Sequence, residues 1–180
     1  MTTLSQRFPS RAFVPEKIQF DPELRFQDAR LKQALAYWTG KQAGREMPGR
    51  RDLRPAEMTA FLPDVLLFDV LADDGARQYR FRLMGTRVAE HYGEHTGELV
   101  DDGPNEIARQ RWRVVLDHAC ETRGAVRAVS RAADPYKQWL LAEGVLAPLG
   151  DDDGTVAMVF CVMMFRPETE LSDSERKRSR

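Results

Sequence analysis

Residues 78–103 read QYRFRLMGTRVAEHYGEHTGELVDDG, and their hydrophobic pattern changes midway. In the first part, large apolar side chains alternate with arginines, so Tyr79, Phe81 and Leu83 are predicted to share one face of a strand. The nearly continuous apolar run at 65–71 predicts a second strand. The turn-forming sequence ADDGAR lies between the two, which predicts an antiparallel hairpin.

After Gly85 the strand pattern stops, and short helical turns are expected instead. Thr86 can cap a helix over residues 87–92, and Gly93 can end it, because glycine readily adopts the backbone conformation that closes a helix. Further glycines interrupt the segment up to residue 103. The hairpin is therefore followed directly by a patch of short helices and loop.

Downstream of this patch, the sequence predicts one long helix and three more strands. Pro104 suits the first turn of a helix that carries Trp112 on its apolar face and ends near Gly124. The three strands are predicted at 125–131, 138–149 and 155–165. The last strand is apolar on both faces, as expected at the centre of a covered sheet.

Upstream of the hairpin, a helix, a polar loop and a shorter helix are expected. Asp21 can cap the first helix, which would run to about Gly40 or Gly44. The shorter helix would begin at Pro55 and stop before Pro63. The first helix would carry one apolar stripe, formed by Leu24, Leu31, Leu35 and Trp38. This stripe needs an apolar partner, either the protein's own sheet or a second chain.

The order helix, two strands, short helices, long helix, three strands favours an α+β fold. We expect a five-stranded antiparallel sheet with short helices and one long helix on one face, plus the N-terminal helix. The expected division is an irregular segment 1–20, a helix–loop–helix segment 21–62, a core 63–166 and a charged tail 167–180.

The composition is that of one globular domain, with 180 residues, 42% hydrophobic residues and a net charge of −1. Nothing in this charge attracts nucleic acid. The chain shows no signal-peptide pattern and no apolar run near the roughly 20 residues of a membrane span, so we expect a cytoplasmic protein. Four arginines within residues 45–54 indicate either a solvated loop or a contact for an anionic partner.

Three stretches resemble a family of small, single-domain bacterial PAS-like proteins. They are LAYWTGKQAGREMPGRRDLRPAEMTAFLPDVLLFDV at 35–70, YRFRLMGTRVAEHYGEHTGELV at 79–100 and AEGVLAPLGDDDGTVAMVF at 142–160. The first stretch is the most specific, whereas the closing hairpin is common to PAS domains generally. The predicted order of strands and helices is also that of the PAS fold.

The resemblance implies a non-catalytic sensory or regulatory module. PAS domains bind small molecules or cofactors between the sheet and the short helices, and they pair through an N-terminal helix and the outer face of the sheet. We therefore expect a protein partner, a homodimer and a small-molecule ligand whose identity is unknown. The alternative is a ligand-free interaction or scaffold module whose own side chains fill the cavity. The residues expected to line the ligand cavity are Phe81, Arg87, His91, Tyr92, Trp112, Trp139 and Met163.

The sequence HYGEH places two histidines four residues apart, the spacing of a metal-binding pair on one helix face. A helix end at Gly93 would break this geometry, and no third ligand lies nearby. We therefore expect no metal site. His91 is predicted either to bond a backbone carbonyl or to line the cavity, and His95 to lie on the surface.

Haem-binding PAS sensors carry their axial histidine on the long helix, where this chain has His118. That residue lies off the predicted apolar face, so we interpret it as a surface histidine. Neither Cys120 nor Cys161 has the Asn-Cys-Arg setting of a flavin photosensor or a metal or disulfide pattern. The sequence contains no phosphate-binding loop and no nucleophile elbow, so no catalytic residue is predicted.

Overall fold

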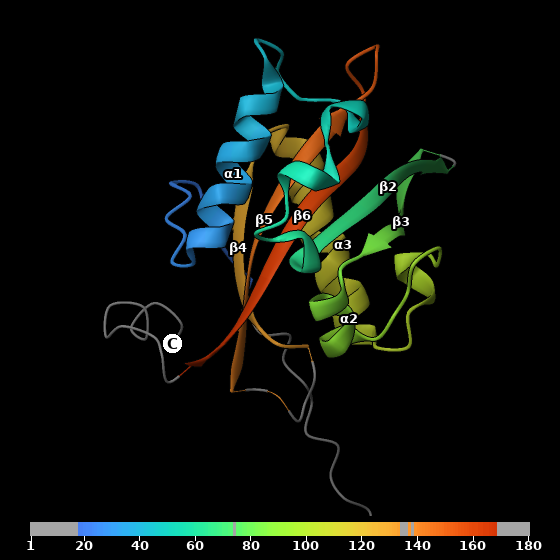
Figure 1. Cartoon of the computed structure of the whole chain (residues 1–180). Coiled ribbons are helices and arrows are strands. Elements are labelled where there is room, and N and C mark those ends of the chain that lie inside the picture. Colours follow the sequence, from blue (N-terminus) through green and yellow to red (C-terminus); the bar gives the residue numbers. More distant parts are fainter. Residues whose placement is uncertain (1–17, 74, 134–136, 138, 169–180) are drawn as a thin grey trace, which may run out of the picture.

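The computed structural model describes residues 18–73, 75–133, 137 and 139–168. In this part of the chain, one antiparallel sheet of six strands in the order β1-β4-β5-β6-β2-β3 lies between two helical layers (Figure 1). The strands are β1 Gln19–Asp21, β2 Val65–Asp73, β3 Ala76–Met84, β4 Val126–Arg131, β5 Leu140–Gly150 and β6 Val156–Pro167. The helices are α1 Ala29–Gln42, α2 Thr86–Tyr92 and α3 Glu106–Thr122, with 3-10 turns η1 Arg50–Asp52, η2 Pro55–Glu57, η3 Leu62–Asp64 and η4 Val100–Asp102.

One face of the sheet packs against α2, η4 and α3. Phe68 of β2 contacts Phe81 and Trp112, each with 5.0 Å between ring centroids. Leu116 and Ala119 of α3 are fully buried in the same cluster. This inner face supports the short helices that the sequence predicts after Gly85.

The other face of the sheet packs against α1 and the 3-10 turns. Leu31, Ala34 and Trp38 of α1 are buried against β5 and β6, and the Trp38 indole Nε1–H donates to the carbonyl of Pro148 at 2.9 Å. The apolar partner of the N-terminal stripe is therefore the protein's own sheet. That stripe no longer argues for a second chain, and the expected homodimer stays a prediction.

The expected α+β class and antiparallel sheet are confirmed, and the sheet is one strand larger than expected. Residues 18–20 were expected to be irregular, but β1 pairs with β4, with Phe20 opposite Ala128. A three-residue edge strand is too short to leave a pattern in the sequence. The first 17 residues lie outside the described part of the chain.

The first helix begins later than predicted. Asp21 does not cap it; its carboxylate accepts the backbone N–H groups of Glu23 and Arg25 in a turn that follows β1. The helix begins after Asp28, whose side chain accepts from the N–H of Arg30 at 2.8 Å. Both aspartates cap backbone groups, and only the tertiary structure distinguishes the turn from the helix.

A β-bulge changes the face of one predicted core residue. Leu67 pairs with Leu83 and Phe68 pairs with Phe81, so Arg82 is an extra residue in β3. Tyr79 and Phe81 are buried as predicted, but Leu83 is 36% exposed. Met84 is the residue that is buried in its place.

The last strand extends beyond the predicted boundary of the core. The Arg131 guanidinium forms two hydrogen bonds with the Glu168 carboxylate, at 2.6 and 2.7 Å, and the Glu168 backbone N–H donates to Trp139. Residues 167 and 168 therefore pack on the sheet. The rest of the predicted tail, 169–180, lies outside the described residues, and the division into segments remains a prediction.

Candidate functional site

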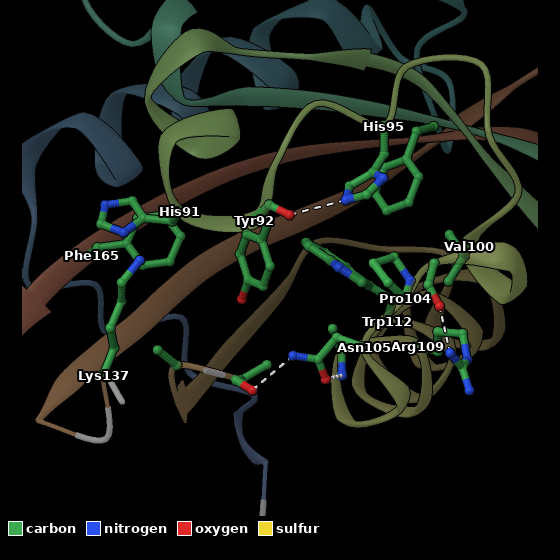
Figure 2. A pocket seen from close by; sticks show the side chains of 15 residues that line it. His91, Tyr92, His95, Val100, Pro104, Asn105, Arg109, Trp112, Lys137 and Phe165 are labelled. Carbon is green, nitrogen blue, oxygen red and sulfur yellow. Dashed lines mark hydrogen bonds between the residues drawn. The ribbon is translucent and has the colours of Figure 1, made fainter. Parts of the chain in front are cut away.

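A cavity of about 120 Å³ lies between β3, α2, the start of α3 and the connection that follows β4 (Figure 2). Its lining residues are Phe81, His91, Tyr92, His95, Val100, Gly103, Pro104, Asn105, Ala108, Arg109, Trp112, Ala132, Ala133, Lys137 and Phe165. The cavity adjoins the inner core and is open to solvent on one side. It is the place where a PAS-like fold is expected to hold a ligand.

Aromatic rings form much of the cavity wall. The Tyr92 ring centroid lies 5.8 Å from that of Trp112 and 5.8 Å from that of Phe165. Phe81 meets Trp112 edge-on at 6.1 Å. Such a wall offers apolar contact and ring stacking to a flat molecule.

His91 lies on α2, with its ring stacked on Phe165 at 3.9 Å between centroids (Figure 2). Burial lowers the pKa of His91, and the nearby charge of Lys137 lowers it further. Its buried Nδ1 has no hydrogen-bond partner among the described residues. His91 is therefore a neutral side chain at the cavity wall, and its Nδ1 forms no hydrogen bond with the described residues.

His95 lies at the cavity, and the expectation that it lies on the surface is wrong. Its side chain is 18% exposed. Nδ1 lies 2.7 Å from the Glu98 carboxylate, and Nε2 lies 3.0 Å from the Tyr92 carbonyl. Hydrogen bonds between Phe81 and the segment around Gly97 hold this loop against β3, which brings His95 inward.

Tyr92 is the last residue of α2, and its side chain points into the cavity (Figure 2). Burial raises the pKa of Tyr92 to about 12, so the hydroxyl keeps its proton at neutral pH. No hydrogen bond to this hydroxyl is formed within the described part of the chain. The hydroxyl is thus available to a bound molecule as donor or acceptor.

The opposite wall is built from the start of α3. The Asn105 side chain accepts from the Ala108 N–H at 3.0 Å and donates to the Ala133 carbonyl at 3.1 Å, so its polar atoms are engaged. Arg109 donates to the Gly103 carbonyl but forms no ion pair with a carboxylate of the described residues. Among the residues that the structure describes, the lining therefore contains the cationic side chains of Arg109 and Lys137 and no acidic side chain.

Two of the seven predicted lining residues lie elsewhere. Arg87 of α2 forms a bidentate ion pair with Asp64 of η3, outside the cavity. Trp139 is 57% exposed and does not line the cavity. Met163 lines a smaller cavity of about 30 Å³ that shares Tyr92 and Trp112 with the cavity beneath α2. The structure places Phe81, His91, Tyr92 and Trp112 together at the cavity beneath α2.

Several lining residues were missed by the sequence analysis. Asn105 carried a detectable signal, since asparagine before a helical run is a preferred cap. Lys137 and Ala133 carried none, because the connection between β4 and β5 has no periodic pattern.

The geometry does not favour a metal or haem site. No cluster of three potential metal ligands occurs among the described residues. Gly93 ends α2 with φ 86°, and His91 and His95 lie on either side of Tyr92 (Figure 2). The His118 ring lies 4.1 Å from that of Phe20 on β1, so it is partly covered and does not reach the cavity. A cavity of about 120 Å³ is also far smaller than a haem.

Two of the four arginines in the arginine-rich loop form ion pairs within the protein. Arg45 meets Asp52 at 2.7 Å, and Arg51 meets Asp152 of the β5–β6 turn at 2.6 Å. These contacts partly neutralise the loop. The structure therefore favours a solvated loop over a contact for an anionic partner.

The fold and the cavity define the class of protein. A five-stranded antiparallel core with short helices and one long helix on the same face is the PAS arrangement, and a family model described as "PAS domain" matches residues 26–164. The chain belongs to this family. A comparison with curated proteins finds no match. No helix in the described part of the chain is long and apolar enough to cross a membrane.

Proposed function

We propose that the protein is a non-catalytic, cytoplasmic sensory module that binds a small molecule in the cavity beneath α2 and signals through a protein partner. The observation that carries the proposal is the cavity itself, with aromatic walls and two polar atoms, His91 Nδ1 and the Tyr92 hydroxyl, that the described residues leave without partners. Binding sites combine apolar walls with a few polar groups in this way.

A signalling route is available through Asp64. Its side chain, only 5% exposed, pairs with Arg87 of α2 and lies 3.6 Å from Arg30 of α1. This carboxylate therefore connects the helix that forms the cavity wall with the helix on the opposite face of the sheet. A ligand that shifts α2 would change the Asp64 contacts and so the surface at α1.

The second candidate is a ligand-free interaction module. The small volume of the cavity, about 120 Å³, favours it, because such a space can remain empty. Trp139, which is 57% exposed, would then be a candidate contact for a protein partner. A homodimer rests on the family resemblance alone.

A thermal-shift screen against metabolite mixtures separates the two candidates. Ala108 lines the cavity, so Ala108→Phe should fill it and abolish any shift that the wild type shows. Ala36→Phe places the same side chain at an exposed position of α1 and is the control. No stabilising mixture for the wild type, together with recovery of a protein partner, would favour the ligand-free module.

A further inference from the structure

We infer that the cavity takes a small aromatic monocarboxylate, with its ring against Trp112 and Phe81 and the carboxylate toward His91, Tyr92 and Lys137. This inference rests on the proposed function and names the chemical class of its ligand. Three properties of the cavity carry it: volume, wall chemistry and charge.

The volume limits the ligand to about one ring. A cavity of about 120 Å³ is close to the roughly 150 Å³ that holds benzene in an engineered protein core. A two-ring or nucleotide-sized molecule would require α2 or α3 to move. The ligand is therefore a molecule of about the size of benzoate.

The walls are suited to a flat ring at one end and a polar group at the other. Trp112, Val100 and Pro104 gather toward the His95 side of the cavity (Figure 2). The Phe81 ring also lies there, with its centroid 5.9 Å from that of His95. His91 and Lys137 lie on the far side of Tyr92, with the lysine side chain extending toward the imidazole (Figure 2). A ligand with one apolar end and one polar end can satisfy both parts of this lining.

The charge indicates that the polar end is an anion. Lys137 and Arg109 both line the cavity, no Asp or Glu of the described residues does, and Arg109 has no carboxylate partner among those residues. Of the acidic side chains described near the cavity, Glu98 contacts His95 and Asp101 pairs with Arg113, whereas Glu90 lies on α2 beside His91 and raises its pKa. A carboxylate can accept from the protonated Tyr92 hydroxyl, in the field of the lysine.

Calorimetric titration with benzoate and with benzamide tests the inference, because the two have nearly the same shape and differ in charge. We expect benzoate to bind at least tenfold more tightly. Lys137→Met should weaken benzoate binding about tenfold and leave benzamide unchanged, as expected for a charged contact. Lys41→Met, which removes a lysine of α1 that pairs with Glu57, is the control and should bind benzoate like the wild type.

Equal affinities for benzoate and benzamide would overturn the carboxylate assignment while leaving a ring-binding cavity. Failure of both to bind would overturn the ligand class. The proposed function would survive either result if another small molecule stabilised the wild type and not Ala108→Phe. The comparison of the two probes uses the wild-type protein, so it decides the charge question even if a variant fails to fold.

Discussion

Gly85 joins the end of β3 to the first residue of α2 at a point where the chain has no room for a side chain. A Cβ built on Gly85 would lie 2.3 Å from the carbonyl oxygen of Pro63. Its backbone N–H donates to the Val65 carbonyl at 2.7 Å. The sequence marks this glycine as the point where the pattern changes, but the close approach of η3 is visible only in the folded structure.

Gly85→Ala should destabilise the protein by about 3 kcal/mol, because backbone atoms must move to admit the methyl group. Gly40→Ala is the matched control. Gly40 lies inside α1 with nothing within 4 Å of an added Cβ, so this change should stabilise by about 0.5–1 kcal/mol. Urea unfolding of both variants checks the prediction, and similar free energies of unfolding for the two would contradict it.

His91 should make stability depend on pH near neutrality. Burial holds the pKa of His91 below its usual 6.5 in the folded state, so folding favours the neutral form. This contribution is complete above about pH 6.5 and is lost as the pH falls toward the lower folded-state pKa. Compared with His91→Gln, the wild type should lose thermal stability between pH 7.5 and 5.5. Parallel pH profiles of the melting temperature would refute this role.

The two histidines show which features of the site can be predicted from the local sequence and which cannot. The helix end at Gly93 was predictable from glycine chemistry, and it separates His91 from His95 as expected. The inward position of His95 was not predictable, since it depends on hydrogen bonds between the Gly97–Glu98 segment and Phe81. Long-range backbone pairing of this kind leaves no local signal.

At the scale of elements, the order of the long helices and the strands along the chain followed from the sequence, whereas their boundaries did not. The short helix expected between Pro55 and Pro63 is instead two 3-10 turns, η2 and η3. The bulge at Arg82 exposes Leu83 although the alternation in the sequence continues. The capping chemistry of Asp21 is real, but it serves a turn after β1 and not a helix. In both cases the pairing with a neighbouring strand overrides the local preference.

The link between α2, η3 and α1 leads to a prediction for Asp64. Asp64→Asn should destabilise the fold by about 2 kcal/mol, because it weakens a nearly buried ion pair whose arginine partners are half exposed. Asp152→Asn is the control. The Arg51 side chain is 74% exposed and the Asp152 side chain is 84% exposed. The free energy of unfolding should therefore change by no more than about 0.5 kcal/mol in Asp152→Asn. Equal effects in denaturant melts would show that Asp64 has no special structural role.

The described part of the molecule is a sheet covered on both faces, with α1 on one side and α2 and α3 on the other (Figure 1). The cavity lies on the side of α2 and α3. The PAS-like order of elements was predictable because β2 to β6, α1 and α3 are long enough to show their period and glycines mark the ends of α2. The cavity was predictable in position but not in detail. Its lining comes from five separate parts of the chain, and its volume depends on how these parts pack.

If Asp64 transmits binding, a stabilising ligand should slow or speed amide hydrogen exchange in α1 as well as in α2. In Asp64→Asn the α2 response should remain and the α1 response should be reduced. Hydrogen-exchange mass spectrometry on wild type and variant provides the comparison. An unchanged α1 response in Asp64→Asn would exclude this route.

The most direct measurement of ligand sensing is native mass spectrometry of the protein as purified from cells under gentle conditions. The account predicts that the wild type retains a small molecule of about one ring, and that Ala108→Phe, whose cavity is filled, does not. A wild-type mass equal to that of the bare chain, with no small molecule recovered after the protein is denatured, would contradict the account and leave the ligand-free interaction module.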